Sequence, residues 1–457
     1  MTSYTLGFSL VIFGITTLFT FPTWKKSFNK LKGNERLTVI AWVLIFVGQG
    51  QMFAQKEAAV GISTLGTGAY YQVTWMALGS LFMLIALISG KVNTKHCSIA
   101  IIGLLLYGVV GLGGSAFSPS PSLSIYKSLQ IIMDVALLVT ALSFIKNPRL
   151  LINLSYFLLI LILVSSAMGG FLWPELNFQN IYGAYTGVLH SHYPQVHANE
   201  LGLLAAIILI ASVRRTFEKG LKYQRYYWGS VAILAITVLY HAQARTSLAS
   251  ATIAIFIMAI FIPRMRPFTV LLTIGLGSFL TLQWLNGGIN LNIEGSTVET
   301  YLRRGASDEQ ISSLSGRTEL WRIGWKMFID SPVFGHGMDA GVRYGGRLYG
   351  LPAGTNMHSS HFQILANMGF LGYLSWLIFV LAVTASLWKG VWNSPNSLRS
   401  EEGRFRLELI LVASVILFRT FLGHVLVTNS FSLLVFIALF VSILASRNVQ
   451  KSSKLVI

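Results

Sequence analysis

Long apolar stretches recur along the whole chain, and they constrain its fold more than any other feature. A membrane-spanning helix needs about 20 consecutive apolar residues. Hydrophobic residues make up 54% of the chain and charged residues only 11%, which excludes a single water-soluble domain. Apolar stretches that qualify as spans occur at residues 4–22, 37–54, 70–90, 97–117, 123–145, 150–172, 198–213, 228–241, 246–263, 268–285, 361–388, 407–425 and 430–446. We therefore predict an all-α integral membrane protein with about 12 to 13 transmembrane helices.

The basic residues divide unevenly between the two sides of these predicted helices. If successive loops alternate sides, one set of loops carries 23 of the 34 Lys and Arg residues, whereas the short loops of the other set carry only Lys56 and Arg245. Loops rich in Lys and Arg stay in the cytoplasm, so we predict that the first set is cytoplasmic. The net charge of +18 is then a topology signal, and we predict no nucleic-acid partner.

One long polar loop separates the predicted helices into groups. We expect N-terminal transmembrane helices over residues 1–180, central transmembrane helices with turns at Asn199 and Arg245 over 181–285, a large extracytoplasmic loop with short amphipathic helices over 286–360, and C-terminal transmembrane helices over 361–457. Within the loop, residues 318–330 place apolar side chains on one helical face and Arg322 and Lys326 on the other. That pattern predicts a helix that lies on the membrane surface and ends before Pro332.

Histidine is concentrated on the predicted outer side. Only His96 falls on the cytoplasmic side; the other eight histidines, at outer loops or outer helix ends, are His190, His192, His197, His241, His336, His358, His361 and His424. Either they form a polar outer site, or they occupy wet helix ends that tolerate histidine. His358 and His361 could share a helical face and bind a metal, but no carboxylate lies close in sequence, so we predict no metal site. The single cysteine, Cys97, excludes a cysteine-rich zinc site and an iron–sulfur site.

Two outer arginines are candidates for anion binding. Arg245 lies in a tight turn on the side that is nearly free of basic residues, and Arg317 opens the amphipathic helix. A guanidinium group is well shaped to bind a lipid phosphate or pyrophosphate. Alternatively, Arg245 extends to a lipid headgroup and Arg317 pairs with an acid such as Glu319.

Three charged residues fall inside apolar stretches. Lys127 and Asp134 are seven residues apart on one face of the same predicted helix, and Arg419 lies in another. Charges within a membrane mark functional sites or structural pairs between helices, and the sequence leaves both interpretations open.

Several segments in a fixed order resemble the O-antigen ligase and polymerase family. Residues 317–321 (RTELW) and 330–337 (DSPVFGHG) resemble the family's Arg-x-x-x-Trp helix and Pro-x-x-Gly-x-Gly turn. Residues 358–372 (HSSHFQILANMGFLG) resemble its His-Asn-x-x-Leu-Gln segment and the following Gly-x-x-Gly. Upstream, residues 243–245 (QAR) are similar to a Ser-Arg turn, and residues 194–202 to a Pro-Asn-x-x-Gly helix start.

The resemblance implies glycan transfer from undecaprenyl pyrophosphate on the periplasmic face of the bacterial inner membrane, without a metal, a nucleotide sugar or another cofactor. His358 matches the histidine that activates the acceptor hydroxyl, and His361 is the second catalytic candidate. The donor-binding candidates are Arg245, Arg317, Arg322, Gln243, Asn199, His190 and His192, and the loop-shaping residues are Pro332, Gly335 and Gly337. Two positions depart from the family pattern: Ser359 replaces the usual Asn, and residues 173–197 contain no Arg or Lys, so that His190 and His192 stand in for an arginine.

The residues themselves suit such a reaction. Fixed guanidinium groups stabilise the charge on a leaving pyrophosphate, and histidine is a base suited to neutral pH. The leading prediction is a ligase that joins O-antigen to lipid A-core, with membrane lipids around it. The alternatives are an O-antigen polymerase that joins lipid-linked repeats, a protein O-oligosaccharyltransferase, and a lipid-linked glycan flippase or transporter that uses Lys127, Asp134 and Arg419.

Overall fold

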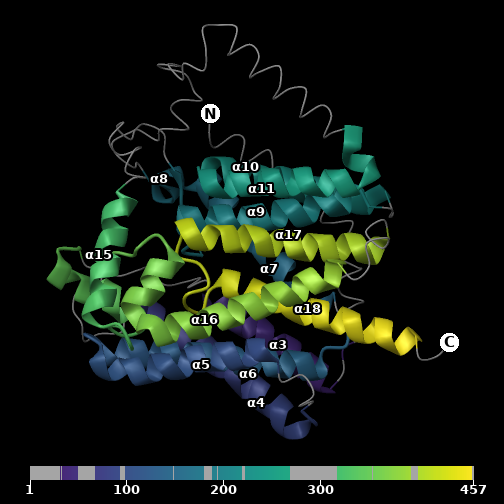
Figure 1. The fold of residues 1–457 in the computed structure, drawn as a ribbon. Helices are drawn as coiled ribbons and strands as arrows, with labels where there is room; N and C mark the ends of the chain where they lie inside the picture. The colour runs from purple at the N-terminus through teal and green to yellow at the C-terminus, as the bar shows by residue number, and fades with distance from the viewer. Residues whose placement is uncertain are drawn as a thin grey trace, which may run out of the picture.

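The computed structural model describes residues 31, 33–49, 67–92, 98–147, 149–179, 188–192, 194–218, 222–267, 316–352, 354–392 and 400–454. Within these ranges the long helices lie side by side in a bundle (Figure 1): α3 (Gly33–Gln49), α4 (Thr67–Ser89), α5 (Ile99–Gly114), α6 (Pro121–Phe144), α7 (Leu150–Leu172), α9 (Ala198–Thr216), α10 (Lys222–His241), α11 (Arg245–Phe261), α16 (Ser360–Trp392), α17 (Glu401–Leu422) and α18 (Phe431–Lys454). Helix α15 (Arg317–Asp330) lies across one end of the bundle, which we call the α15 end.

Short elements complete the described fold near the helix ends. Helix α8 (Pro174–Asn177) follows α7, and β1 (Phe178–Gln179) pairs antiparallel with β2 (Val188–Leu189). The remaining turns of helix are η2 (Ser115–Phe117), η3 (Pro263–Met265), η4 (Gly341–Gly345) and η5 (Gly346–Tyr349).

The prediction of an all-α membrane protein is confirmed. In the described residues, five helices are long and apolar enough to cross a membrane, namely α4, α5, α6, α7 and α16, while α11 and the apolar part of α18, Phe431–Ser446, are shorter. Eleven of the thirteen predicted apolar stretches coincide with described helices. The stretches 4–22 and 268–285 lie outside the described residues.

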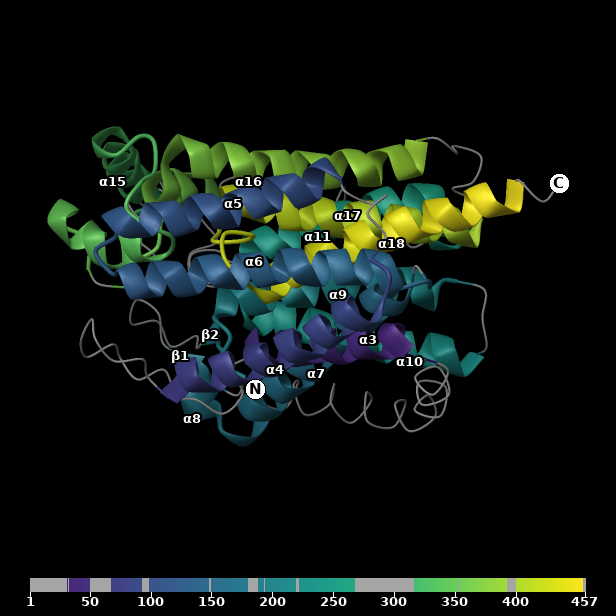
Figure 2. The same cartoon turned by 90° about the horizontal axis from the view of Figure 1, so that it is seen from below.

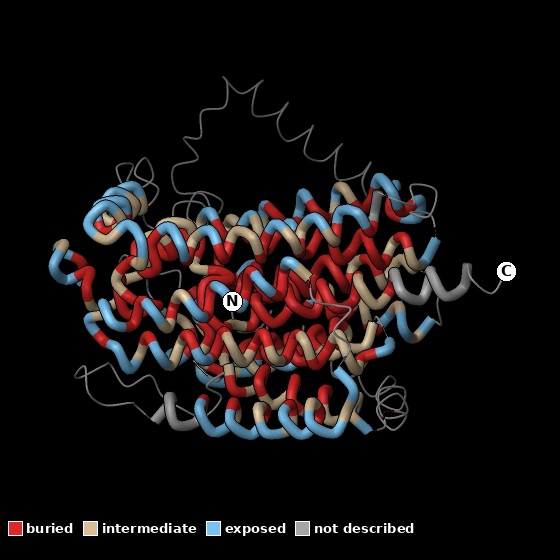
Figure 3. The backbone as a smooth tube through the Cα atoms, turned by 60° about the horizontal axis from the view of Figure 1, so that its bottom comes forward, coloured by how far each residue is buried: buried red, intermediate tan, exposed pale blue. Residues whose placement is uncertain are grey.

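Burial divides the bundle into a buried interior and an exposed outer surface (Figure 3). Helix α9 is buried along almost its whole length, because its own residues are apolar on nearly every face of the helix. In contrast, α4, α5 and α11 expose large apolar side chains such as Leu81, Ile99 and Ile253. In a membrane protein these exposed apolar faces are the surfaces that meet lipid.

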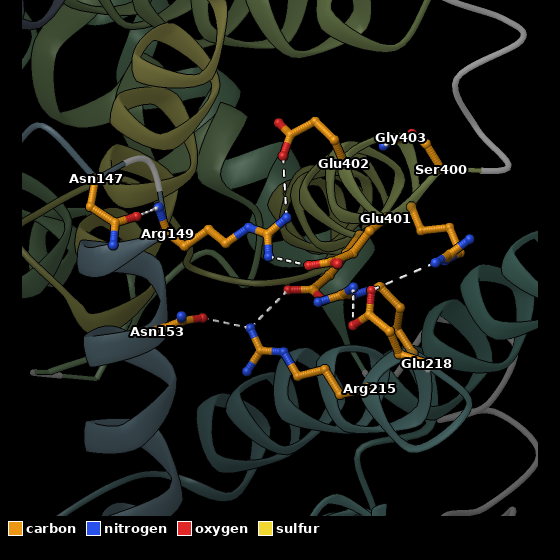
Figure 4. A network of polar contacts seen from close by, with 12 residues as sticks. Asn147, Arg149, Asn153, Arg215, Glu218, Ser400, Glu401, Glu402 and Gly403 are labelled. Atoms are coloured by element: carbon orange, nitrogen blue, oxygen red, sulfur yellow. Dashed lines mark hydrogen bonds and ion pairs between the residues drawn. The ribbon is translucent and has the colours of Figure 1, made fainter. Parts of the chain in front are cut away.

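Buried ion pairs and a hydrogen bond join α17, α9 and α7 at the end of α17 that lies away from α15. Glu408 of α17 is fully buried, and its carboxylate bonds to Arg214 and, at 3.4 Å, to Arg215 of α9. Arg215 also donates to Asn153 of α7 at 2.7 Å (Figure 4). Nearby, Arg149 pairs with Glu401 at the start of α17. Basic segments that the sequence assigned to one side therefore do meet at one end of the bundle.

A non-helical segment between α17 and α18 lies inside the bundle. Figure 2 shows this segment, residues 423–430 (yellow), in the region of α5, α6 and α16. Tyr107 and Trp376 donate to the carbonyls of Val427 and Leu426 at 2.6 and 2.9 Å, and Asn429 donates to Asp134 at 2.9 Å. Irregular backbone inside a membrane protein needs such internal partners.

Helix α16 is broken at Gly369, where φ is +63°. A Cβ atom there would lie 2.5 Å from the backbone of Val333, so the turn after α15 approaches α16 as only glycine allows. The Phe370 N–H donates to the carbonyl of Pro332 at 2.7 Å instead of continuing the helix. This contact fixes the turn after α15 to the first part of α16.

Candidate functional site

Histidines from separate elements gather at the α15 end. His197 precedes α9, His358 precedes α16, and His424 follows α17, so that helix ends bring them together. The charges of His197 and His424 both act on the imidazole of His358, as do those of Arg317 and Arg419. We call these five residues the His358 cluster.

His358 lies in an unusual backbone conformation. Its φ is +48°, which is uncommon for a residue other than glycine, and the side chain of Asn356 accepts the His358 N–H at 3.0 Å. Such conformations occur at functional sites, where the surroundings hold them in place. Among the described residues the imidazole has no hydrogen-bond partner.

The surroundings of His358 keep its ring neutral. Burial, followed by the positive charge of Arg317 and then the smaller effects of His197, His424 and Arg419, lowers the pKa of His358 to about 4. A group with that pKa is deprotonated at neutral pH. The ring can therefore accept a proton from a bound molecule.

Arg317 is placed by the tryptophan one turn further along α15. Trp321 stacks on Phe362 of α16, with ring centroids 5.4 Å apart, and donates from Nε1 to the Met357 carbonyl at 3.0 Å. The Arg-x-x-x-Trp spacing thus attaches the first turn of α15 to the segment that contains His358. The helix starts after Gly316, where φ is +78°.

Arg419 reaches the same region from α17. Its side chain is 2% exposed and hydrogen-bonds to Thr246, the residue after Arg245. The sequence marked Arg419 as an intramembrane charge but not as a donor-binding residue. Its position near the outer end of the stretch 407–425 was the available signal, and His197 and His424 were recognisable only as members of the outer histidine set.

The turn before α11 packs tightly on α9. Gln243 has φ of +47°, and a Cβ atom on Gly202 would lie 2.1 Å from the Cβ of Ala244. The two upstream segments of the family resemblance are therefore in contact. In the described structure the Oε1 atom of Gln243 is buried without a hydrogen-bond partner, and Arg245 opens α11 beside it.

The hairpin segment before α9, which comprises β1, β2 and the described residues up to His197, contains the remaining upstream candidates His190 and His192. The rings of His190 and His197 meet edge to face, 4.8 Å apart. Asn177 accepts the backbone N–H of His192 at 2.9 Å, and the N–H of Asn199 donates to His197 Nδ1 at 3.2 Å. These contacts connect the hairpin segment to the His358 cluster through His197.

His361 occupies a different environment from His358. Its Nδ1 lies 3.0 Å from the Tyr373 hydroxyl and its Nε2 lies 3.3 Å from the Thr420 hydroxyl. Its ring packs against Phe421 at 4.6 Å. Because both nitrogens have partners, His361 serves the contact between α16 and α17, and the geometry favours His358 as the base.

Other predicted residues shape the region or lie apart from it. A Cβ atom on Gly335 (φ +66°) would lie 2.4 Å from the backbone of Asn367. Gly337 packs against Ser118, and the carbonyl of Pro332 accepts the hydrogen bond from the Phe370 N–H, directly after the break in α16. Arg322 is 73% exposed and pairs with Glu319 at 2.6 Å, so it does not join the His358 cluster.

The described residues contain no group of three or more His, Cys, Asp or Glu side chains arranged to hold a metal ion.

Comparison with known families selects the same region of the chain. Residues 230–377 match a family model described as O-antigen ligase. The matched range contains Gln243, Arg245, Arg317 and His358, while His197, Arg419 and His424 lie outside it. No curated protein gives a significant match to the chain.

Proposed function

We propose that the chain, whose residues 230–377 match the O-antigen ligase family model, transfers the glycan of an undecaprenyl-pyrophosphate donor to a lipid A-core acceptor. O-antigen ligase-type glycan transfer by a multi-pass membrane protein is the level of function that the family match supports. The observation that carries the finer proposal is the His358 cluster, in which a half-buried neutral imidazole lies within the field of two guanidinium groups, Arg317 and Arg419. We place this cluster on the periplasmic face of the inner membrane, since the basic loops meet at the other end.

In the proposed reaction, the acceptor hydroxyl attacks the anomeric carbon of the donor glycan. The bond from that carbon to the pyrophosphate oxygen breaks as the new glycosidic bond forms. His358 takes the hydroxyl proton, and undecaprenyl pyrophosphate leaves with the bonding electrons. A single displacement of this kind inverts the anomeric centre.

The arginines stabilise the leaving group. Negative charge grows on the pyrophosphate as the bond breaks, and fixed guanidinium groups in a water-poor site offset it. Arg419 is held by Thr246 and Arg317 by the docking of α15, so neither group must reorganise during the step. We assign Arg245, Gln243, Asn199, His190 and His192 to the wider donor site because their segments adjoin the cluster.

The donor also prepares the base. In the free protein, burial and then the cations beside His358 lower its pKa. A bound pyrophosphate brings negative charge to those cations and so raises the pKa of His358 toward the range of an effective base. Proton transfer is therefore favoured only when the donor is in place.

A reconstituted transfer assay tests the proposal. The purified protein is mixed with undecaprenyl-pyrophosphate glycan and lipid A-core in the presence of a chelator, and the products are separated by mass. We expect ligated glycan on lipid A-core and free undecaprenyl pyrophosphate. Longer lipid-linked chains without use of the core would assign the protein as a polymerase, and movement of intact donor across a vesicle membrane without any product would assign it as a flippase.

A further inference from the structure

Lys127 is a cation in a membrane helix, and it does not belong to the His358 cluster. The proposed reaction therefore assigns it no role. It lies in the span Pro121–Phe144, and its Nζ lies 5.4 Å from the ring centroid of its neighbour Tyr126. Within the described part of the chain, no carboxylate lies within ion-pair distance of it. A charge at such a position is costly unless it has a partner or a ligand.

The contacts of α6 bring Lys127 beside η4. Ser124, one turn before Lys127, donates to the carbonyl of Met338 at 3.1 Å, and Gly337 packs against the same serine. The residues that follow therefore lie next to Lys127. The charges of Asp339 and Arg343 both act on it, and these two residues pair with each other at 3.8 Å.

Lys127, Asp339 and Arg343 form what we call the Lys127 cluster. It holds two cations and one carboxylate, so one positive charge is in excess. Asp339 is buried and has φ of +61°, while the Arg343 side chain is 42% exposed. The excess positive charge is therefore buried on the side of Asp339 and accessible to solvent on the side of Arg343.

The Lys127 cluster adjoins the His358 cluster through His424. The Ser360 hydroxyl, two residues after His358, bonds to the backbone of Gly423 and Val425 on either side of His424. His424 in turn acts on His358 and is acted on by the charges of the Lys127 cluster. The two groups of cations reach this region from different elements, α15 and α17 in one case and α6 and η4 in the other.

We propose that the Lys127 cluster binds an anionic group, a phosphate or a carboxylate, on the acceptor glycan. This inference rests on the proposed function, because a transfer reaction must bring two substrates to His358. If the donor pyrophosphate lies against Arg317 and Arg419, the excess positive charge of the Lys127 cluster is left to bind the acceptor. An anionic acceptor gives Lys127 the partner that it lacks within the described protein.

Equilibrium binding tests the proposal without requiring transfer. The probes are a phosphorylated lipid A-core, the same glycolipid after phosphatase treatment, and undecaprenyl pyrophosphate. We expect the wild-type protein to bind the phosphorylated form about tenfold more tightly, as for one charge-assisted hydrogen bond. Lys127→Gln abolishes that difference, Lys127→Arg retains most of it, and the exposed control Lys326→Gln leaves it unchanged.

Two results would overturn the inference. One is equal binding of both glycolipids by the wild-type protein, and the other is weaker binding of undecaprenyl pyrophosphate by Lys127→Gln, which would assign Lys127 to the donor. Arg343→Gln, at a half-exposed position, replaces Lys127→Gln if that variant does not fold. Phosphate-dependent binding without any transfer in the assay above supports this inference and contradicts only the proposed function.

Discussion

His358 combines two properties that a base in this position needs. Its imidazole lacks a hydrogen-bond partner within the described structure, so the ring is available to a substrate. Burial and then the charge of Arg317 lower its pKa, so the ring stays unprotonated at neutral pH until negative charge arrives. The neighbouring cations are suited to bind the pyrophosphate that brings this charge, which couples donor binding to base strength.

The pH dependence of the free enzyme follows from the lowered pKa of His358. The unprotonated base is present above about pH 4, and activity that depends on it is lost as the pH falls through that value. We expect kcat/KM for the donor to stay level between about pH 7 and 5.5 in the wild type. Removing the charge of Arg317 in Arg317→Gln raises the pKa of His358, so that the acid limb moves to higher pH. An unchanged limb in the variant would show that Arg317 does not act on the base.

Arg419 is expected to contribute to catalysis through the leaving group. Arg419→Gln removes a fixed charge near the pyrophosphate, and we expect kcat to fall by about 10² or more. Thr246→Val keeps the charge but removes its anchor, and a smaller loss is expected. Single-turnover transfer rates measure both effects. Equal losses in the two variants would mean that the contact itself, and not the charge, is what the reaction requires.

At the scale of elements, buried ion pairs hold α9 and α17 together at one end while the site is formed at the other. Glu408 and Arg419 are eleven residues apart on α17, or about 16 Å along its axis. The structural charges are therefore separated from the proposed catalytic ones, and the two groups can be changed independently.

Glu408→Gln tests the structural group. The variant removes the buried carboxylate from Arg215 and leaves Arg214 with Glu218 alone, and we expect a loss of about 3–5 kcal/mol in the free energy of unfolding. Glu401→Gln breaks the more exposed pair with Arg149, and a loss below about 1 kcal/mol is expected. Unfolding of the two variants in detergent provides the comparison. Similar losses would contradict the assignment of Glu408 as the buried link.

Gly369 tests the docking of the turn after α15. In Gly369→Ala the new methyl group meets the Val333 backbone and the residue must keep a positive φ, so we expect a loss of about 1–3 kcal/mol and reduced transfer. Gly229→Ala in α10 is the control, because its added methyl group has only Thr216 nearby, at 3.9 Å. A destabilisation shared by both variants would indicate a general response to alanine instead of the loss of this contact.

At the scale of the whole molecule, apolar length and charge distribution predicted much of the fold. The lengths of the apolar stretches located the described helices, and the predicted topology together with the family resemblance selected His358, Arg317 and Arg245 as candidates. The buried segment 423–430 and the break at Gly369 could not be predicted, because each depends on partners distant in sequence, such as Tyr107 and Val333. For the same reason, Arg419 was recognisable as unusual but not as a neighbour of His358.

The orientation of the bundle is a prediction for the whole molecule. In a Cys97→Ala background, Lys326→Cys on α15 is expected to react with a membrane-impermeant thiol reagent added to spheroplasts. Lys222→Cys, at the end of the bundle away from α15 where the basic segments meet, is expected to react only after permeabilisation. The positive-inside rule is the physical reason. Labelling of Lys222→Cys from outside would reverse the proposed topology.

The central claim is that His358 is the base for glycan transfer, and the transfer rate of His358→Ala under single-turnover conditions tests it most directly. We predict a loss of about 10² to 10⁴, partial recovery on addition of free imidazole, and unimpaired donor binding. His361→Gln, matched for folding, is predicted to keep most of the activity because its ring serves a helix contact. Full activity in His358→Ala, or a comparable loss confined to His361→Gln, would contradict the account.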